Sequence, residues 1–290
     1  MHRAWLEVLR CPACGQPLVL DATRAAGDEV VEAFLACGGC LEVRVVVGGS
    51  AVLPQRLEAH LREQGGIYRR MPLADPRVVR FVLARLGSGD DSVPVDELLA
   101  AYGDLRPGAP TPPPAGALAL GALAARAAQQ GPLARALDVG CGAGRGTFEL
   151  ARHAARVLGV DRSAARIRRA RNLAVTAEGF RLPAAPGTRG EVSLELERLA
   201  RAGVDWAVAE PACLPLAGGS MDLVVLHAAD GRGPLADAAV AAEALRVLRP
   251  AGWRVRPEAL PAAWAAAWAA AGRDAREVAR EGGWVLEACA

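Results

Sequence analysis

The chain has 290 residues, a formal net charge of +2 and 52% hydrophobic residues. This composition excludes a wholly disordered chain, and the near-neutral balance excludes a strongly basic nucleic-acid-binding protein. The uncharged stretches at 107–125 and 259–272 are interrupted by prolines or too short to span a membrane, and the amino-terminal residues lack the pattern of a secretory signal. We therefore expect a cytoplasmic protein with no membrane association.

Four of the seven cysteines lie near the amino terminus, among short apolar runs at 18–20, 30–36 and 41–47 that predict small strands. Cys11, Cys14, Cys37 and Cys40 form the pattern C-x2-C-x22-C-x2-C. Each pair can present two sulfurs from one turn, and four thiolates satisfy tetrahedral zinc without leaving an open coordination position. In a reducing compartment this grouping favours a structural zinc site, with a chance cluster of unmetallated thiols as the alternative.

The segment after the cysteines carries first a helical pattern and then a stretch rich in proline and glycine. Residues 55–102 carry leucines and valines at helical spacing, and residues 106–116, RPGAPTPPPAG, hold too much proline and glycine for a regular element. We therefore predict three parts: a zinc ribbon at 1–54, a helical connector with a proline-rich linker at 55–113, and an α/β domain at 114–290.

Strand and helix patterns alternate beyond residue 113. Strands are predicted at 136–139, 157–160, 206–209, 221–226 and 253–255, and helices at 118–129, 147–153, 163–175 and 234–248, the third capped by Ser163. This alternation predicts a Rossmann-like, doubly wound, mostly parallel sheet with helices on both faces. An insertion before residue 206 carries alternating Val192, Leu194 and Leu196, typical of the second arm of a hairpin.

The carboxyl-terminal segment is short. It has room for one alanine-rich helix at 261–280, in which Trp264 and Trp268 would pack, and one strand at 284–288. A sheet shortened at its C-terminal edge is therefore one expectation.

A glycine-rich turn, LDVGCGAG at 137–144, follows the first predicted strand of the α/β domain. Glycines there let the backbone approach a ligand closely, and the following helix offers free N–H groups. The register does not fit the dinucleotide pattern G-x-G-x-x-G, and the chain has no lysine for a phosphate-binding P-loop. Asp161 ends the next strand, where a carboxylate can accept both hydrogens of a ribose diol; a helix-capping or surface aspartate is the alternative.

Residues 134–255 resemble the class I S-adenosylmethionine-dependent methyltransferases through four motifs in order. These are LDVGCGAG, GVD at 159–161, AEPACLPLAGGSMDLVV and EALRVLRPAGW. The resemblance implies S-adenosyl-L-methionine as cofactor, with Asp138, Gly140, Cys141, Gly142 and Gly144 around its methionine moiety, Asp161 on the ribose, Arg162 along the adenine, and Glu210 with Pro211 at the adenine amino group. Glu210 stands where the family usually has aspartate.

The segment LEVLRCPACGQPL…LACGGCLEVRVVVGGSAVLP resembles the small zinc-ribbon activator subunit that partners tRNA, rRNA and release-factor methyltransferases. Residues 41–53 keep that family's hydrophobic outline without its tyrosine and proline. The resemblance implies contact with an RNA or protein partner through the ribbon.

The acceptor of a methyl group is not defined by any motif. Where amine and glutamine methyltransferases carry Asn/Asp-Pro-Pro-Tyr/Phe, this chain has LHAAD, which leaves His227 as either a base or a histidine packed at a strand end. Seven arginines between residues 152 and 171 form either an RNA-binding face or a solvated helix surface. The sequence thus predicts a methyltransferase with an unidentified small-molecule, RNA or protein acceptor; the alternative is a catalytically degenerate relative acting as a zinc-ribbon binding or partner module.

Overall fold

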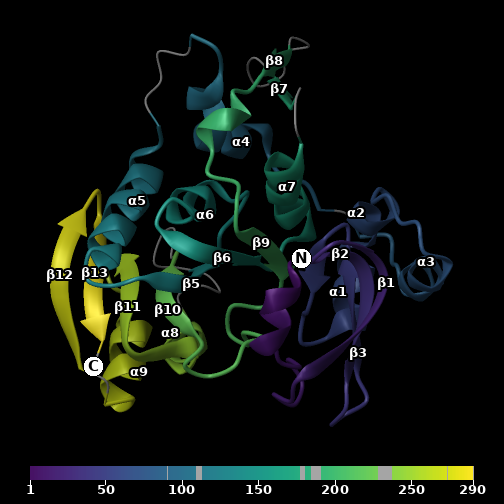
Figure 1. Cartoon of the computed structure of the whole chain (residues 1–290), viewed down its shortest axis with the longest axis horizontal. Coiled ribbons are helices and arrows are strands. Elements are labelled where there is room, and N and C mark those ends of the chain that lie inside the picture. Colours follow the sequence, from purple (N-terminus) through teal and green to yellow (C-terminus); the bar gives the residue numbers. More distant parts are fainter. Residues whose placement is uncertain are drawn as a thin grey trace.

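A single eleven-stranded sheet runs through the computed structural model, which describes residues 1–89, 91–108, 113–176, 180–183, 191–227, 237–272 and 274–289 (Figure 1). The strand order is β1-β2-β3-β4-β9-β6-β5-β10-β11-β13-β12. The strands are β1 (Leu18–Ala26), β2 (Glu29–Cys37), β3 (Val43–Val47), β4 (Ser50–Val52), β5 (Leu133–Val139), β6 (Ala154–Asp161), β9 (Val204–Val208), β10 (Met221–Leu226), β11 (Leu248–Pro257), β12 (Ala275–Glu281) and β13 (Trp284–Cys289).

The six central strands, from β4 to β11, pair in parallel, whereas the strands at both ends pair antiparallel. The helices are η1 (Arg3–Glu7), α1 (Leu57–Glu63), α2 (Gly65–Arg69), α3 (Pro76–Leu83), α4 (Val95–Tyr102), η2 (Gly103–Leu105), α5 (Ala115–Ala128), α6 (Arg145–Leu150), α7 (Ala164–Val175), η3 (Leu196–Arg198), α8 (Ala238–Val247) and α9 (Ala262–Ala270). Apolar side chains of α8, α9 and η1 pack on one face of the sheet, and those of α5, α6 and α7 pack on the other. The predicted α/β class with helices on both faces is confirmed.

The central strands are buried on both faces, because helices cover both. Every residue of β9 and β10 is buried, which explains why their sequences are apolar apart from one aspartate in each, Asp205 and Asp222. Residues on one face of these strands, such as Leu137 and Val139, pack against α8 and α9, and alternate residues, such as Ala136, pack against α5.

The C-terminal edge corrects the sequence prediction. Helix α9 ends at Ala270 and is followed by two strands, β12 and β13, so the sheet is not shortened and the predicted helix at 261–280 is wrong in its second half. Gly272, with φ of 60°, turns the chain after the helix, and Gly282 and Gly283, with φ of 50° and 81°, make the turn between the strands. The predicted packing of the two tryptophans of α9 is confirmed, with Trp264 0% and Trp268 6% exposed.

The amino-terminal strands continue the same sheet. Strands β1 to β4 form an antiparallel meander, and β4 then lies parallel to β9, with Ala51 opposite Ala207 and Val52 opposite Val208. The purple amino-terminal strands and the yellow β13–β12 pair therefore lie at opposite ends of the sheet (Figure 1). The domain boundaries at residues 54 and 113 stay predictions.

The connector is helical, as predicted, and consists of the short helices α1 to α4. The predicted hairpin in the insertion pairs β7 (Arg181–Pro183) with β8 (Glu191–Ser193); residues 184–190 lie outside the described residues. None of the helices in the described parts of the chain has the length and apolar character needed to cross a bilayer.

Candidate functional site

The glycine-rich turn joins β5 to α6 in the conformation that its sequence requires. Gly140, Gly142 and Gly144 have φ of 77°, 56° and 94°, in the left-handed region that side chains disfavour. At Gly144 a Cβ atom would lie 2.4 Å from the ring of Trp206, so a side chain is also excluded by space. The turn therefore presents backbone alone to whatever lies beside it.

Asp161 fixes this turn to the end of β6. Its Oδ2 accepts from the backbone N–H of Gly142 at 3.1 Å, and its Oδ1 accepts from the N–H of Ser163 at 2.8 Å. Burial raises the pKa of this carboxyl, opposed by these N–H donors and by Arg166. Ser163 caps α7 as predicted, accepting from the N–H of Arg166 at 3.1 Å. An acidic group thus lies directly beside the glycine turn.

A second acidic network lies at the end of β5. Asp138 is 0% exposed; its Oδ2 accepts from the hydroxyl of Thr147 at 2.6 Å, and its Oδ1 lies 2.7 Å from Nε2 of His227. The ring of His227 also meets Trp284 edge-on at 5.0 Å. Both oxygens of Asp138 therefore have partners within the protein, and its predicted contact with the methionine moiety stays a prediction.

The position of His227 is set by topology. It follows β10, the neighbour of β5, and these two strands flank the point where the strand order reverses. In open α/β sheets ligands bind at such a reversal, beyond the carboxyl ends of the strands. The sequence left His227 as either a base or a histidine packed at a strand end. The structure agrees with both, because the ring packs at the end of β10 and a buried carboxylate orients it as it would orient a base.

The remaining predicted contacts lie on neighbouring loops. Oε2 of Glu210, after β9, accepts from the backbone N–H of Gln55 at 2.7 Å, and Pro211 is buried. Arg162 has an exposed side chain, and its carbonyl accepts from the amide of Gln64 at 3.0 Å. The structure thus gathers the glycine turn, Asp161, Arg162 and Glu210 at one edge of the sheet.

The connector also lies against this edge, which the sequence did not indicate. Oε1 of Glu97 on α4 would be 3.7 Å from a Cβ atom at Gly142, and the hydroxyl of Tyr102 donates to the carbonyl of Ala143 at 2.6 Å. Glu97 also forms a bidentate ion pair with Arg166 of α7, at 2.9 and 2.8 Å.

Two further contacts hold the connector against α6 and α7. Oε1 of Gln64 accepts from the N–H of Ala164 at 2.6 Å, at the start of α7. Asp104, beyond α4, pairs with Arg145 of α6 through two bonds of 2.8 and 3.1 Å. Polar residues on short helices are usually solvated, so no sequence signal marked these residues.

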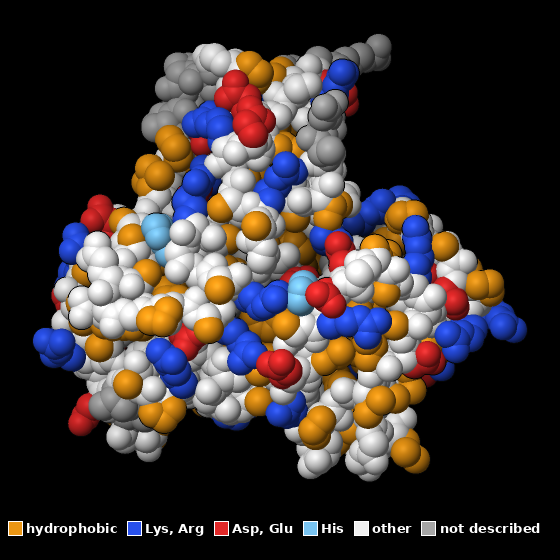
Figure 2. All heavy atoms as spheres, viewed as in Figure 1, with side chains coloured by type: hydrophobic (Ala, Val, Ile, Leu, Met, Phe, Trp, Pro, Cys, Tyr) orange, Lys and Arg blue, Asp and Glu red, His pale blue; other side chains and the backbone are white. Residues whose placement is uncertain are grey.

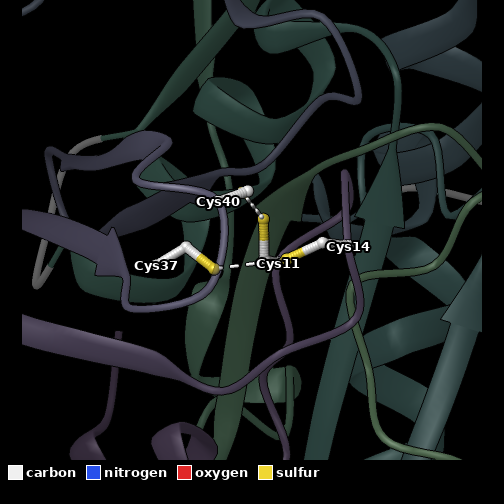
Figure 3. A group of neighbouring side chains, drawn as sticks. All are labelled: Cys11, Cys14, Cys37 and Cys40. Atoms are coloured by element: carbon white, nitrogen blue, oxygen red, sulfur yellow. Dashed lines mark hydrogen bonds between the residues drawn. The ribbon is translucent and has the colours of Figure 1, made fainter.

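The four predicted metal ligands converge at one end of the ribbon (Figure 3). Their Sγ atoms all lie within 4.8 Å of one another, with Cys11 3.6 Å from Cys40 and Cys14 3.3 Å from Cys37. The pKa of Cys37 is lowered to about 6, chiefly because the backbone N–H of Cys40 donates to its sulfur. Four soft donors at these separations fit one tetrahedral Zn²⁺ with Zn–S bonds of about 2.3 Å.

This sheet, with its reversal of strand order, its glycine turn and the neighbouring carboxylate, defines an open α/β fold. Residues 137–255 match the model of a family described as a methyltransferase domain. No curated protein matched the chain.

Several solved structures are similar to the chain. YcgJ from Bacillus subtilis is 17% identical over 56% of this chain and 70% of its own, with a TM-score of 0.38. A SAM-dependent methyltransferase from Methanosarcina mazei is 23% identical over 43% of this chain and 51% of its own, with a TM-score of 0.32. A ribosomal protein L11 methylase from Lactobacillus delbrueckii subsp. bulgaricus is 16% identical over 58% of this chain and 76% of its own, with a TM-score of 0.39. These TM-scores lie below 0.5, so no activity or acceptor follows from them.

Proposed function

We propose that the chain is an S-adenosylmethionine-dependent methyltransferase with a structural zinc site in its amino-terminal ribbon. The observation that carries this proposal is Asp161, which is fixed by Gly142 beside the left-handed glycine turn within the matched residues. The alternative, a degenerate binding module, loses one of its grounds, because the C-terminal edge of the sheet has both strands. Glu210 in place of aspartate remains its other ground.

The residues around the glycine turn can be assigned roles toward the cofactor. The backbone from Gly140 to Gly144 allows close approach, Asp161 would accept from the ribose hydroxyls, and Glu210 would use its Oε1, since Oε2 accepts from Gln55. Bound S-adenosylmethionine would supply an electrophilic methyl group on a sulfonium. Transfer to an already nucleophilic acceptor depends largely on alignment, so the chain's contribution is to orient the two reactants.

His227 is our candidate for a base. If its Nε2 carries the proton that Asp138 accepts at 2.7 Å, Nδ1 is left unprotonated and able to take a proton from an acceptor. The acceptor itself, a small molecule, RNA or protein, is unidentified.

The four cysteines would hold one zinc ion with no open position, so we assign the metal a structural role. Contact of this ribbon with an RNA or protein partner is part of the proposal.

The test is calorimetric titration of the zinc-loaded full chain with S-adenosylmethionine and S-adenosylhomocysteine. We expect micromolar binding, and Asp161→Asn should weaken it about 10- to 100-fold, because a charged hydrogen bond contributes about 1.5–3 kcal/mol. The matched control is Asp75→Asn, since Asp75 also accepts two backbone N–H groups, at the start of α3 and outside the predicted cofactor contacts. Absence of binding to the folded wild-type protein would refute the proposal, and an unchanged affinity in Asp161→Asn would refute our placement of the ribose.

A further inference from the structure

The arginines that the sequence gathers before and along α7 differ in their partners. Arg166 pairs with Glu97, and Arg171 pairs with Glu29. Arg168 and Arg169 form no ion pair with a carboxylate in the described residues, although carboxylates neutralise their neighbours on the same helix. The surface of α7 therefore has two parts: carboxylates neutralise Arg166 and Arg171, whereas the part with Arg168 and Arg169 is left basic.

This basic part of α7 faces a cavity between α7, α2 and the loop before α4. Its volume is about 320 Å³, at the lower end of the range of about 300–1,000 Å³ for ligand pockets. Arg70, Arg168, Arg169 and Asn172 line it, and basic side chains gather over this region of the surface (Figure 2). We call this cavity the arginine notch.

Positively charged residues outnumber negatively charged ones around the arginine notch. Asp91 is the one acidic residue among the described residues that line it, and its carboxylate already accepts from the hydroxyl of Ser163. Arg168 lies close to Arg70, donating to its carbonyl at 2.8 Å. Burial lowers the pKa of Arg168, and the like charges of Arg70 and Arg169 lower it further. Burial likewise lowers the pKa of Arg169. An anion in the notch would relieve this repulsion.

The donors suit one kind of anion. Guanidinium groups match tetrahedral oxyanions through paired N–H donors, and the amide of Asn172 adds a neutral donor. The half-buried positions of Arg168 and Arg169 mean that such bonds would be screened less than on an open surface.

We infer that the arginine notch binds a phosphate group of a ligand. The hydrogen bond between Asp91 and Ser163 joins the arginine notch to the turn that carries Asp161. Arg168 lies five residues, or about 7.5 Å of helix rise, beyond Ser163. A phosphate-bearing molecule held here lies beside the proposed cofactor site without occupying it. The inference does not depend on methyl transfer, and it is tested without S-adenosylmethionine.

The experiment measures binding of three probes to the zinc-loaded full chain: a labelled single-stranded RNA by fluorescence anisotropy, and inorganic phosphate and pyrophosphate by calorimetry. We expect Arg168→Gln combined with Arg169→Gln to weaken binding about tenfold or more. The matched control removes two exposed arginines elsewhere, Arg80→Gln with Arg126→Gln, and should change affinity less than about twofold. For RNA, the dependence of log affinity on log salt should become shallower by about 0.7 for each phosphate that the variant no longer neutralises.

Thermal unfolding checks that both double variants are folded. If the glutamine pair does not fold, Arg168→Lys with Arg169→Lys keeps the charge but loses the paired donors, and should weaken binding several-fold. RNA binding that pyrophosphate competes away supports the inference with nucleic acid as the source of the phosphate. Pyrophosphate binding without RNA binding supports it with a small phosphate compound as the source. Absence of binding by all three probes, or equal losses in the notch variant and its control, would overturn it.

Discussion

Replacement of Asp104 by alanine should destabilise the protein strongly, because it breaks the ion pair that joins the connector to the glycine turn. The side chains of Asp104 and Arg145 are 1% and 9% exposed, and their two hydrogen bonds measure 2.8 and 3.1 Å. Removing one partner of a buried pair costs about 3–5 kcal/mol, since the other charge stays buried. Glu149 remains 3.3 Å from the guanidinium, so we expect a smaller cost, about 2–4 kcal/mol.

Differential scanning calorimetry of the zinc-loaded protein measures this cost. A loss of this size corresponds to a decrease in Tm of about 3–7 °C for a chain of 290 residues. The double variant Asp104→Ala with Arg145→Met removes both charges and should be more stable than Asp104→Ala alone, because replacing a whole buried pair by apolar groups is often close to neutral. A loss below about 1 kcal/mol in the single variant, or strictly additive losses in the double variant, would refute the reasoning.

Three further predictions concern the ribbon and the connector. The purified chain should contain one zinc by elemental analysis, and Cys37→Ser should lose the metal and the ordered ribbon, as judged by amide hydrogen exchange; an identical exchange pattern without metal would contradict this. Glu32, which is 0% exposed, accepts from the backbone N–H groups of Ala74 and Asp75, so Glu32→Gln should cost about 1–3 kcal/mol in thermal unfolding, whereas Glu63→Gln, at an exposed site, should cost less than about 0.5. Burial lowers the pKa of His60 to about 4. Below pH 6.5 the unfolded chain therefore takes up a proton that the folded chain does not, and stability falls as the pH decreases, by about 3 kcal/mol at pH 4. Denaturant titrations of wild type and His60→Gln across pH 4–7 should show this acid loss reduced in the variant, and parallel curves would disprove it.

The elements that were predictable from the sequence are those whose local pattern and burial agree. The strand before the glycine turn, Asp161 at the end of its strand and Ser163 as a helix cap all depend on neighbours within a few residues. Strand β12 was missed because it is mostly exposed and its sequence, AREVARE, mixes alanine with charged residues in a way that is equally typical of a surface helix. The two glycines at 282–283 were the available signal for its hairpin.

The candidate site was predictable only in part, for a related reason. Gly142 and Asp161 lie in a motif, whereas Glu97 and Gln64 reach the same edge through long-range packing of short helices. Contacts across about 100 residues leave no periodic signal in one sequence. The pairing of β4 with β9 was hidden for the same reason, although each strand was apolar enough to be buried.

That pairing has a consequence for how the chain can be divided and made. Strand β9 is buried along its whole length, and β4 supplies the partner for one of its two backbone edges. Removing the amino-terminal ribbon would leave an apolar parallel strand with unsatisfied N–H and C=O groups, which other chains can pair with. An excised carboxyl-terminal fragment should therefore aggregate. During synthesis β4 cannot pair until β9, about 150 residues further along the chain, has been made.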